Sequence, residues 1–118
     1  MREQIRDKGR LEHILESINY AFEFTKGVDF EHFKANTMLR FAVIKNIEII
    51  GEAGYKLSRE FKEQHPEVNW EQIIKMCHVL VHGYYQIRDE VAWDVIQKDL
   101  KPLKKQIQTI YEKYNITN

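Results

Sequence analysis

The stretch Thr37–Ser58, TMLRFAVIKNIEIIGEAGYKLS, decides how this chain is expected to fold. Apolar residues recur along it at intervals of three and four, the spacing of one helix face: Leu39, Val43, Ile47, Ile50, Gly54 and Leu57. Phe41, Ile44 and Ile49 add apolar side chains on other faces. A helix with apolar residues on several faces has neighbours on more than one side, so we predict that this helix is central.

Two glycines, Gly51 and Gly54, interrupt the second half of this stretch. Each of them costs about 1 kcal/mol of helix propensity relative to alanine. Close approach of another helix would explain their presence, and so would a plain weak point in the helix.

Helical spacing is also present upstream of the central stretch. It is carried by Leu11, Ile14, Leu15, Ile18 and Phe22. Gly27 is expected to end this helix, and Asp29 is a candidate cap for a short turn that runs through Phe33.

Further helices are predicted downstream. Pro66 prevents helix continuation, and Asn69 is a good N-cap for a helix from Trp70 to about Gly83. A shorter helix is expected to begin at Asp89 and a final one at Asp99. Because no strand pattern is present, we predict an all-α, up-and-down bundle of four to five helices that forms a single domain over residues 1–118.

Composition excludes several classes of protein. The 18 Lys and Arg residues balance the 18 Asp and Glu residues, so only a local basic patch would attract nucleic acid. A single cysteine excludes an internal disulfide framework and a four-thiolate zinc site. No apolar run approaches the roughly 18 residues of a membrane span, and the charged N-terminus is unlike a signal peptide. We therefore expect a cytoplasmic protein that does not bind a membrane.

The densest cluster of reactive side chains is Lys75–Tyr85, KMCHVLVHGYY. His78 and His82 are one helical turn apart, and such a pair can bind zinc. The acidic residue of the metalloprotease helix motif is absent, and Cys77 lies about 100° round the helix from His78, toward the apolar face. We therefore expect no metal and no cofactor. The simpler interpretation is two partly exposed histidines at the edge of a packed helix.

The residues offer two other kinds of chemistry. Cys77 would need a neighbouring base to act as a nucleophile, but adjacent residues such as His78 do not face each other on a helix. A buried, inert thiol is the favoured interpretation. Glu48 and Glu52 are one turn apart, as a carboxylate pair for acid–base catalysis would be, although solvation or ion pairs with nearby lysines explain them equally well.

The order of residues resembles the HepT-like proteins of the HEPN superfamily, and the resemblance covers nearly the whole chain. It begins with Arg10–Leu15 and continues through Asn46–Ala53, NIEIIGEA, a highly characteristic block, and Lys56–Ser58. The remaining matches are Pro66, Trp70, Ile73, Trp93, Asp99, Leu100 and Leu103. Members of this family are partners of minimal nucleotidyltransferases.

The family motif reads Arg-Asn-x-x-x-His-x-Tyr and belongs to a metal-independent RNase in active members. In this register His82 and Tyr84 match the His and the Tyr, whereas Cys77 and His78 stand at the places of the Arg and the Asn. The resemblance implies phosphate binding by the Arg and proton transfer by the His, so His82 is the candidate catalytic residue. Since a thiol lacks the planar set of donors with which Arg binds phosphate, we expect weak or absent RNase activity.

The resemblance also implies partners. Family members form homodimers in which the motifs of two subunits line one cleft. Their antitoxin, a minimal nucleotidyltransferase, transfers AMP from ATP to the Tyr two residues after the motif His, which is Tyr84 here; an aromatic anchor at the helix end is the alternative. The implied function is the toxin component of a type VII-like toxin–antitoxin system that acts on RNA and not on DNA.

Two other functions stay open at this point. The first is a catalytically inactive HEPN module that binds a nucleotide or a nucleotidyltransferase. The second is an unrelated helical interaction domain. The loss of the motif Arg favours an inactive module, whereas the matching His82 and Tyr84 favour the toxin.

Overall fold

The structure, a computed structural model, describes the backbone of residues 2–82 and 89–117 and the side chains of residues 5–80 and 89–114. Throughout these ranges the regular secondary structure is helical. The four long helices are α1 (Arg2–Thr25), α3 (Thr37–Lys56), α5 (Trp70–His82) and α7 (Leu100–Thr117). The short ones are α2 (Phe30–Ala35), α4 (Arg59–Gln64) and α6 (Asp89–Asp94), and a π-helical turn, Val95–Asp99, joins α6 to α7. The all-α prediction is confirmed.

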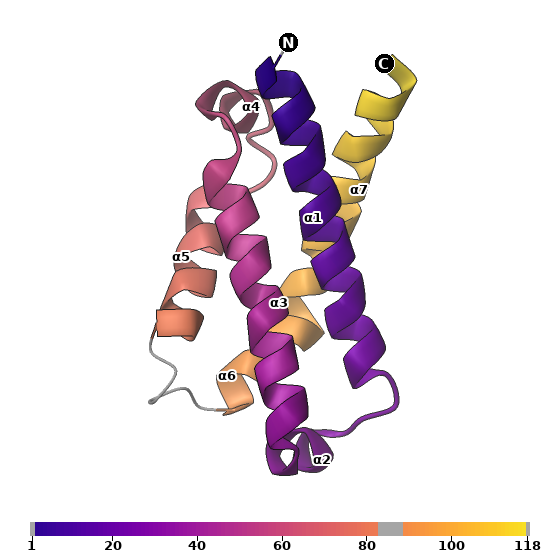
Figure 1. Ribbon diagram of the computed structural model, residues 1–118, viewed down its shortest axis with the longest axis vertical. Helices are drawn as coiled ribbons and strands as arrows, with labels where there is room; N and C mark the ends of the chain where they lie inside the picture. Colours follow the sequence, from indigo (N-terminus) through magenta and orange to yellow (C-terminus); the bar gives the residue numbers. More distant parts are fainter. Residues whose placement is uncertain (1, 83–88, 118) are drawn as a thin grey trace.

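Successive long helices run in opposite directions, so the bundle is up-and-down as predicted (Figure 1). Helix α3 lies between α1 and α5 and packs against both, while α7 packs along α1 (Figure 1). The beginning of α1 and the end of α7 therefore lie at the same end of the molecule, near α4 (Figure 1). None of the described helices is both long enough and apolar enough to cross a membrane.

The predicted central position of α3 is confirmed by burial. Val43, Ile47 and Ile50 are at most 1% exposed, because α1 and α5 cover two sides of the helix. Phe41, on a third side, is 60% exposed within the chain. The apolar character of α3 on several faces thus reflects two covered faces and one that the described residues leave open.

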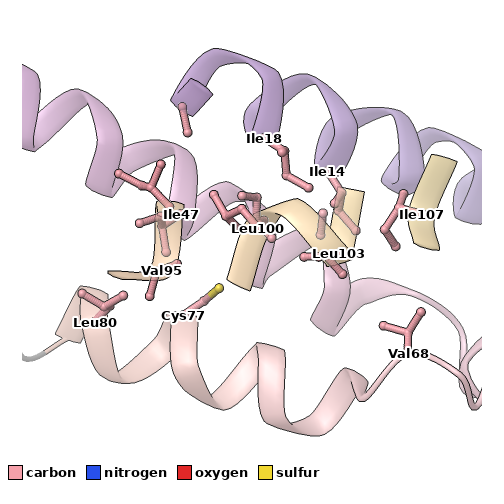
Figure 2. Close-up of a cluster of buried hydrophobic side chains, with 14 of the residues drawn as sticks. Ile14, Ile18, Ile47, Val68, Cys77, Leu80, Val95, Leu100, Leu103 and Ile107 are labelled. Atoms are coloured by element: carbon pink, nitrogen blue, oxygen red, sulfur yellow. The ribbon is translucent and has the colours of Figure 1, made fainter. Parts of the chain in front are cut away.

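The core joins all four long helices. Figure 2 shows side chains that converge from α1, α3, α5, α7 and the turn before α7, among them Ile14, Ile18, Ile47, Leu80, Val95, Leu100, Leu103 and Ile107. Burying each such side chain contributes roughly 1.5–3 kcal/mol. This shared core fixes the position of α3 against its two neighbours.

Side-chain caps start the helices where the sequence predicts. Asp29 accepts a hydrogen bond from the backbone N–H of His32 (2.9 Å) and begins α2. Asn69 accepts one from the N–H of Gln72 (3.2 Å) at the start of α5. Gly27, which follows α1, has a φ of 72°, a left-handed conformation that glycine adopts without strain.

The C-terminal end of α3 differs from the prediction. The helix ends at Lys56, and Ser58 caps α4 by accepting a hydrogen bond from the N–H of Phe61 (3.1 Å). Asp7 of α1 is 4% exposed and accepts two hydrogen bonds, from the N–H (2.8 Å) and the hydroxyl (2.6 Å) of Ser58. A buried carboxylate therefore ties α1 to the junction between α3 and α4.

Candidate functional site

Helix α5 carries the motif positions and has two distinct faces. Trp70, Cys77 and Leu80 are buried against the rest of the bundle. Lys75 and His78 are exposed on the other side, as a step of about 100° per residue requires. The predicted placement of His78 away from the apolar face is confirmed.

A cavity of about 520 Å³ lies between α3 and α5 and contains two of the motif positions. Its α5 wall is formed by Ile74, Cys77 and His78, and its α3 wall by Glu48, Gly51, Glu52, Tyr55 and Lys56. We call this cavity the α3–α5 cleft. Glu48 and Glu52, whose carboxylates are one helical turn apart, therefore lie next to positions 77 and 78.

The carboxylates of the cleft are not equivalent. Glu48 accepts a hydrogen bond from the ammonium of Lys45 (3.1 Å), so it is part of an ion pair along α3. Glu52 is exposed and has no ion-pair partner among the side chains that the structure describes. The ion-pair interpretation from the sequence therefore holds for Glu48, and Glu52 is the carboxylate available to a ligand.

Cys77 is a buried thiol. It is 1% exposed, and Figure 2 shows its sulfur directed into the apolar cluster. Burial, with a smaller contribution from the charge of Asp99, raises the pKa of Cys77 to about 12. The side chain is therefore neutral at physiological pH and supplies neither a nucleophile nor a positive charge.

Close packing of α3 against α5 depends on Gly51. A methyl group on Gly51 would stand 2.5 Å from Cβ of Cys77, well inside van der Waals contact. At Gly54 the nearest atom, Cγ1 of Ile74, would be 3.5 Å away, which is an ordinary contact. The close-approach interpretation is thus confirmed for Gly51, while Gly54 leaves room for a methyl group.

The same glycine determines what position 77 can hold. Cys77 borders both the core and the cleft, and its side chain packs directly over Gly51. Position 77 also lines the same cleft as the carboxylates of Glu48 and Glu52. An arginine there would gain ion-pair partners that the thiol does not use.

Two of the predicted site residues cannot be placed in the cleft. His82 is the last residue of α5, but its side chain lies outside the described residues, and so does Tyr84. In the described part of the chain there is no group of three or more His, Cys, Asp or Glu side chains that could hold a metal ion. The pair His78 and His82 therefore gains no further metal ligands from the described residues.

The fold and the site define a class of protein, and the comparisons identify the family. The up-and-down, all-α bundle, with motif positions 77 and 78 in one cleft, agrees with a HEPN-like fold. A family model described as "Ribonuclease HepT-like" matches residues 14–110. This chain belongs to the HepT-like family.

Three curated relatives match over more than nine-tenths of their own length. A Methanocaldococcus jannaschii protein named "Putative RNase" is 37% identical over 103 residues, which is 87% of this chain and 94% of the relative. A protein with the same name from Caldanaerobacter subterraneus subsp. tengcongensis is 38% identical over 103 residues, or 87% and 92% of the two chains. The "Probable ribonuclease HepT" of Thermococcus cleftensis is 36% identical over 87% of this chain and 94% of its own. No solved structure matches the chain significantly.

Sequence reasoning missed two members of the cleft, Tyr55 and Lys56. The signal was present in part, because Glu48, Glu52 and Tyr55 are four and three residues apart and share a helix face. Nothing in that spacing says which helix borders the face. The assignment to α5 follows from the three-dimensional packing at Gly51.

Proposed function

We propose that this chain is the ribonuclease-type component of a two-component toxin–antitoxin pair and that it acts on RNA in the α3–α5 cleft. The observation that carries the proposal is the meeting of motif positions 77 and 78 with two carboxylates in one cavity of a HepT-like chain. Relatives that are named as ribonucleases and match over nearly their whole length add support.

The proposed reaction is transfer of a phosphodiester within RNA. The ribose 2′-oxygen loses its proton and bonds to the adjacent phosphorus, the bond from phosphorus to the 5′-oxygen breaks, and that oxygen takes up a proton. His82 carries out proton transfer in this scheme. Negative charge grows on the phosphate oxygens, and Cys77, neutral and buried, cannot balance it. Slow cleavage is the consequence.

Neutralisation of the activity is proposed to occur at Tyr84. A minimal nucleotidyltransferase transfers AMP from ATP to its phenol, with release of pyrophosphate. The bulky, negatively charged adduct then excludes RNA by occupation and by like-charge repulsion. Two copies of the chain are proposed to form a homodimer, and the exposure of Met38 (78%), Phe41 (60%) and Val79 (62%) on α3 and α5 supports an apolar contact.

A second function is favoured by the state of Cys77. Because position 77 holds a buried, neutral thiol, the chain has lost the phosphate-binding group of the motif. A catalytically inactive HEPN module that binds a nucleotidyltransferase or its nucleotide fits this loss. The two functions differ in whether RNA is cleaved at all.

Comparison of three chains in an RNA cleavage assay tests the proposal: the natural protein, Cys77→Arg and His82→Ala. We expect weak natural cleavage, no cleavage by His82→Ala, and a gain on the order of a hundredfold for Cys77→Arg, because one preorganised charge donor has about that effect on rate. Strong cleavage that persists in His82→Ala would reject the assigned site. No cleavage by either the natural chain or Cys77→Arg would favour the inactive module.

The site of modification has an internal control, because Tyr85 is adjacent to Tyr84 and chemically identical. Incubation with the partner nucleotidyltransferase, ATP and magnesium is followed by mass spectrometry of the natural chain, Tyr84→Phe and Tyr85→Phe. We expect the AMP adduct to be absent only from Tyr84→Phe. An adduct that survives Tyr84→Phe and disappears in Tyr85→Phe would reject the motif register.

A further inference from the structure

A second cavity, of about 230 Å³, lies on the other side of α3, between that helix and α1. We call it the α1–α3 pocket. Its basic side chains come from both helices: Arg10 and His13 from α1, and Lys45 and Lys56 from α3. Glu48 and Glu52 border it as well, so the same two carboxylates line both cavities.

Arg10 is the side chain that points to a ligand in this pocket. Its Nε is fully buried and has no hydrogen-bond partner among the residues that the structure describes. In the same part of the chain Arg10 also forms no ion pair, although two carboxylates border its pocket. A buried donor without an acceptor costs roughly 1–3 kcal/mol, and more when it is charged. The side chain as a whole is only partly buried, so an oxyanion that enters the pocket can bind its guanidinium.

The balance of charge selects the α1–α3 pocket over the α3–α5 cleft for an anion. The pocket has three permanently cationic side chains, Arg10, Lys45 and Lys56, against two carboxylates. Among the described residues that line the cleft, Lys56 is the one permanently cationic side chain against the same two carboxylates. A phosphate is therefore bound more favourably on the α1 side of α3 than on the α5 side. The planar guanidinium of Arg10 has the geometry to bind phosphate oxygens in pairs.

We propose that the α1–α3 pocket binds a backbone phosphate of the RNA strand, with Arg10 as its principal contact. This inference rests on the proposed action on RNA and adds a binding subsite to it. The pocket and the cleft are separated only by α3, whose width with side chains is about 10 Å. A single strand that crosses α3 places one phosphate over Arg10 and presents a neighbouring nucleotide to the cleft. Arg10 thus holds the substrate and takes no part in bond breaking.

The test measures binding of a fluorescent, single-stranded oligoribonucleotide whose 2′-positions are all O-methylated, so that it cannot be cleaved. Fluorescence anisotropy is recorded at several salt concentrations for the natural chain and for Arg10→Gln. We expect Arg10→Gln to bind roughly tenfold more weakly, because it loses charge-assisted hydrogen bonds to phosphate. The slope of log affinity against log salt should fall by about 0.7, the value for one phosphate contact on a single strand.

Arg59→Gln is the matched control, since it removes the same charge from an exposed position. Arg59 lies on α4, is 92% exposed and pairs with Glu63 (3.1 Å), so its variant should bind within about twofold of the natural chain. Lys45→Gln provides a second variant of the pocket at an exposed position. Lys45→Gln should weaken RNA binding by roughly threefold. If circular dichroism shows that Arg10→Gln is not folded, the affinity of Lys45→Gln tests the proposal instead.

Several results would overturn the inference. Unchanged affinity and salt slope in both Arg10→Gln and Lys45→Gln would do so, and so would an effect of Arg10→Gln on the melting temperature alone. Competition by AMP or inorganic phosphate without any Arg10-dependent binding of the oligonucleotide would assign the pocket to a free phosphate compound. A change of oligomeric state by light scattering, with RNA binding intact, would assign it to a carboxylate of a second copy.

The inference and the proposed function fail separately. Arg10-dependent binding by a chain that never cleaves RNA would reject the proposed catalysis and keep the phosphate subsite. Cleavage that requires His82 but is equal in the natural chain and Arg10→Gln at subsaturating RNA would reject the subsite and keep the catalysis.

Discussion

The two sides of α3 differ in how they are held and in what they offer a ligand. On the α5 side, Gly51 allows contact with a neutral, buried thiol at Cys77, and the cavity beside that contact is acidic. On the α1 side, the cavity is basic and contains a buried guanidinium nitrogen without a partner among the described residues. Both cavities share the carboxylates of α3. Arg10 from α1 and Lys45 from α3 distinguish the two cavities, so the neighbouring helix and the face of α3 together set the charge of each site.

The attachments of α3 differ in the same way. Near the C-terminal end of α3, hydrogen bonds from Ser58 to the carboxylate of Asp7 hold α1 to the α3–α4 junction. Toward α5, the contact at Gly51 is one of close packing between apolar atoms. Hydrogen bonds depend on individual partners, whereas close packing depends on side-chain volume. Removal of an acceptor should therefore disrupt the contact with α1, and added volume should disrupt the contact with α5.

The largest effect is expected in the reactivity of Cys77, which tests the closed, neutral character of the α5 side. With its pKa raised to about 12, only a minute fraction is thiolate at pH 8. Alkylation by iodoacetamide should therefore be roughly a thousandfold slower in the folded chain than in urea, and its rate should rise with pH without reaching a plateau below about pH 12. Mass spectrometry follows the reaction cleanly, since the chain has 1 cysteine.

The same pKa shift makes a prediction for stability. The folded state favours the neutral thiol, so the contribution of Cys77 to the free energy of unfolding is fully present below the ordinary pKa of a cysteine and is lost as pH rises toward about 12.

In the alkylation experiment, equal rates in the folded and unfolded chains would show that Cys77 is open to solvent. The contrast between the two sides of α3 would then be wrong.

The next effect concerns the polar attachment on the α1 side. Asp7→Ala removes the acceptor of both hydrogen bonds from Ser58 and should lower the free energy of unfolding by about 2–3 kcal/mol. Urea denaturation followed by circular dichroism measures it. Asp94→Ala is the control, because the carboxylate of Asp94 is exposed and forms a long ion pair (3.8 Å) with Lys98. This variant should change the free energy of unfolding by less than about 0.5 kcal/mol. Equal effects of the two variants would remove the special role of Asp7.

The smallest effects separate the two glycines of α3. Gly51→Ala should lower the free energy of unfolding by about 1–2 kcal/mol, because α5 must move away from the new methyl group at 2.5 Å from Cβ of Cys77. Gly54→Ala should raise it by up to about 1 kcal/mol, because the helix gains propensity and the contact at 3.5 Å is ordinary. The same urea titration compares them. If Gly51→Ala were as stabilising as Gly54→Ala, the close packing on the α5 side would be disproved.

Much of the fold was readable from local sequence. Helix α1, the central α3 and the helix that carries the motif follow from apolar spacing, and the caps at Asp29 and Asn69 mark the starts of α2 and α5. Helix α4 was not predicted, because Arg59–Gln64 is six residues long and mostly polar. Its existence depends on Ser58 as a cap and on Phe61, which is 1% exposed. Short helices of this kind are stabilised by the surrounding structure more than by their own propensity.

The candidate site, too, could be predicted only in part from the sequence. The motif register and the outward position of His78 could be read from the sequence, and so could a buried Cys77, because all depend on position along one helix. The cleft could not be read, because Glu52 and His78 come from different helices. The α1–α3 pocket required knowledge of which face of α3 meets Arg10.

The sequence by itself determined the long helices, the family and the replacement of the motif Arg by Cys77, because these depend on residue type and on spacing over a few turns. Only the tertiary structure decided that Gly51 meets Cys77, that Asp7 reaches Ser58 across 51 positions, and that Arg10 has a buried donor. Helical periodicity tells which residues share a face. Which faces meet is decided by packing of the whole core, in which residues far apart in sequence compete for the same space.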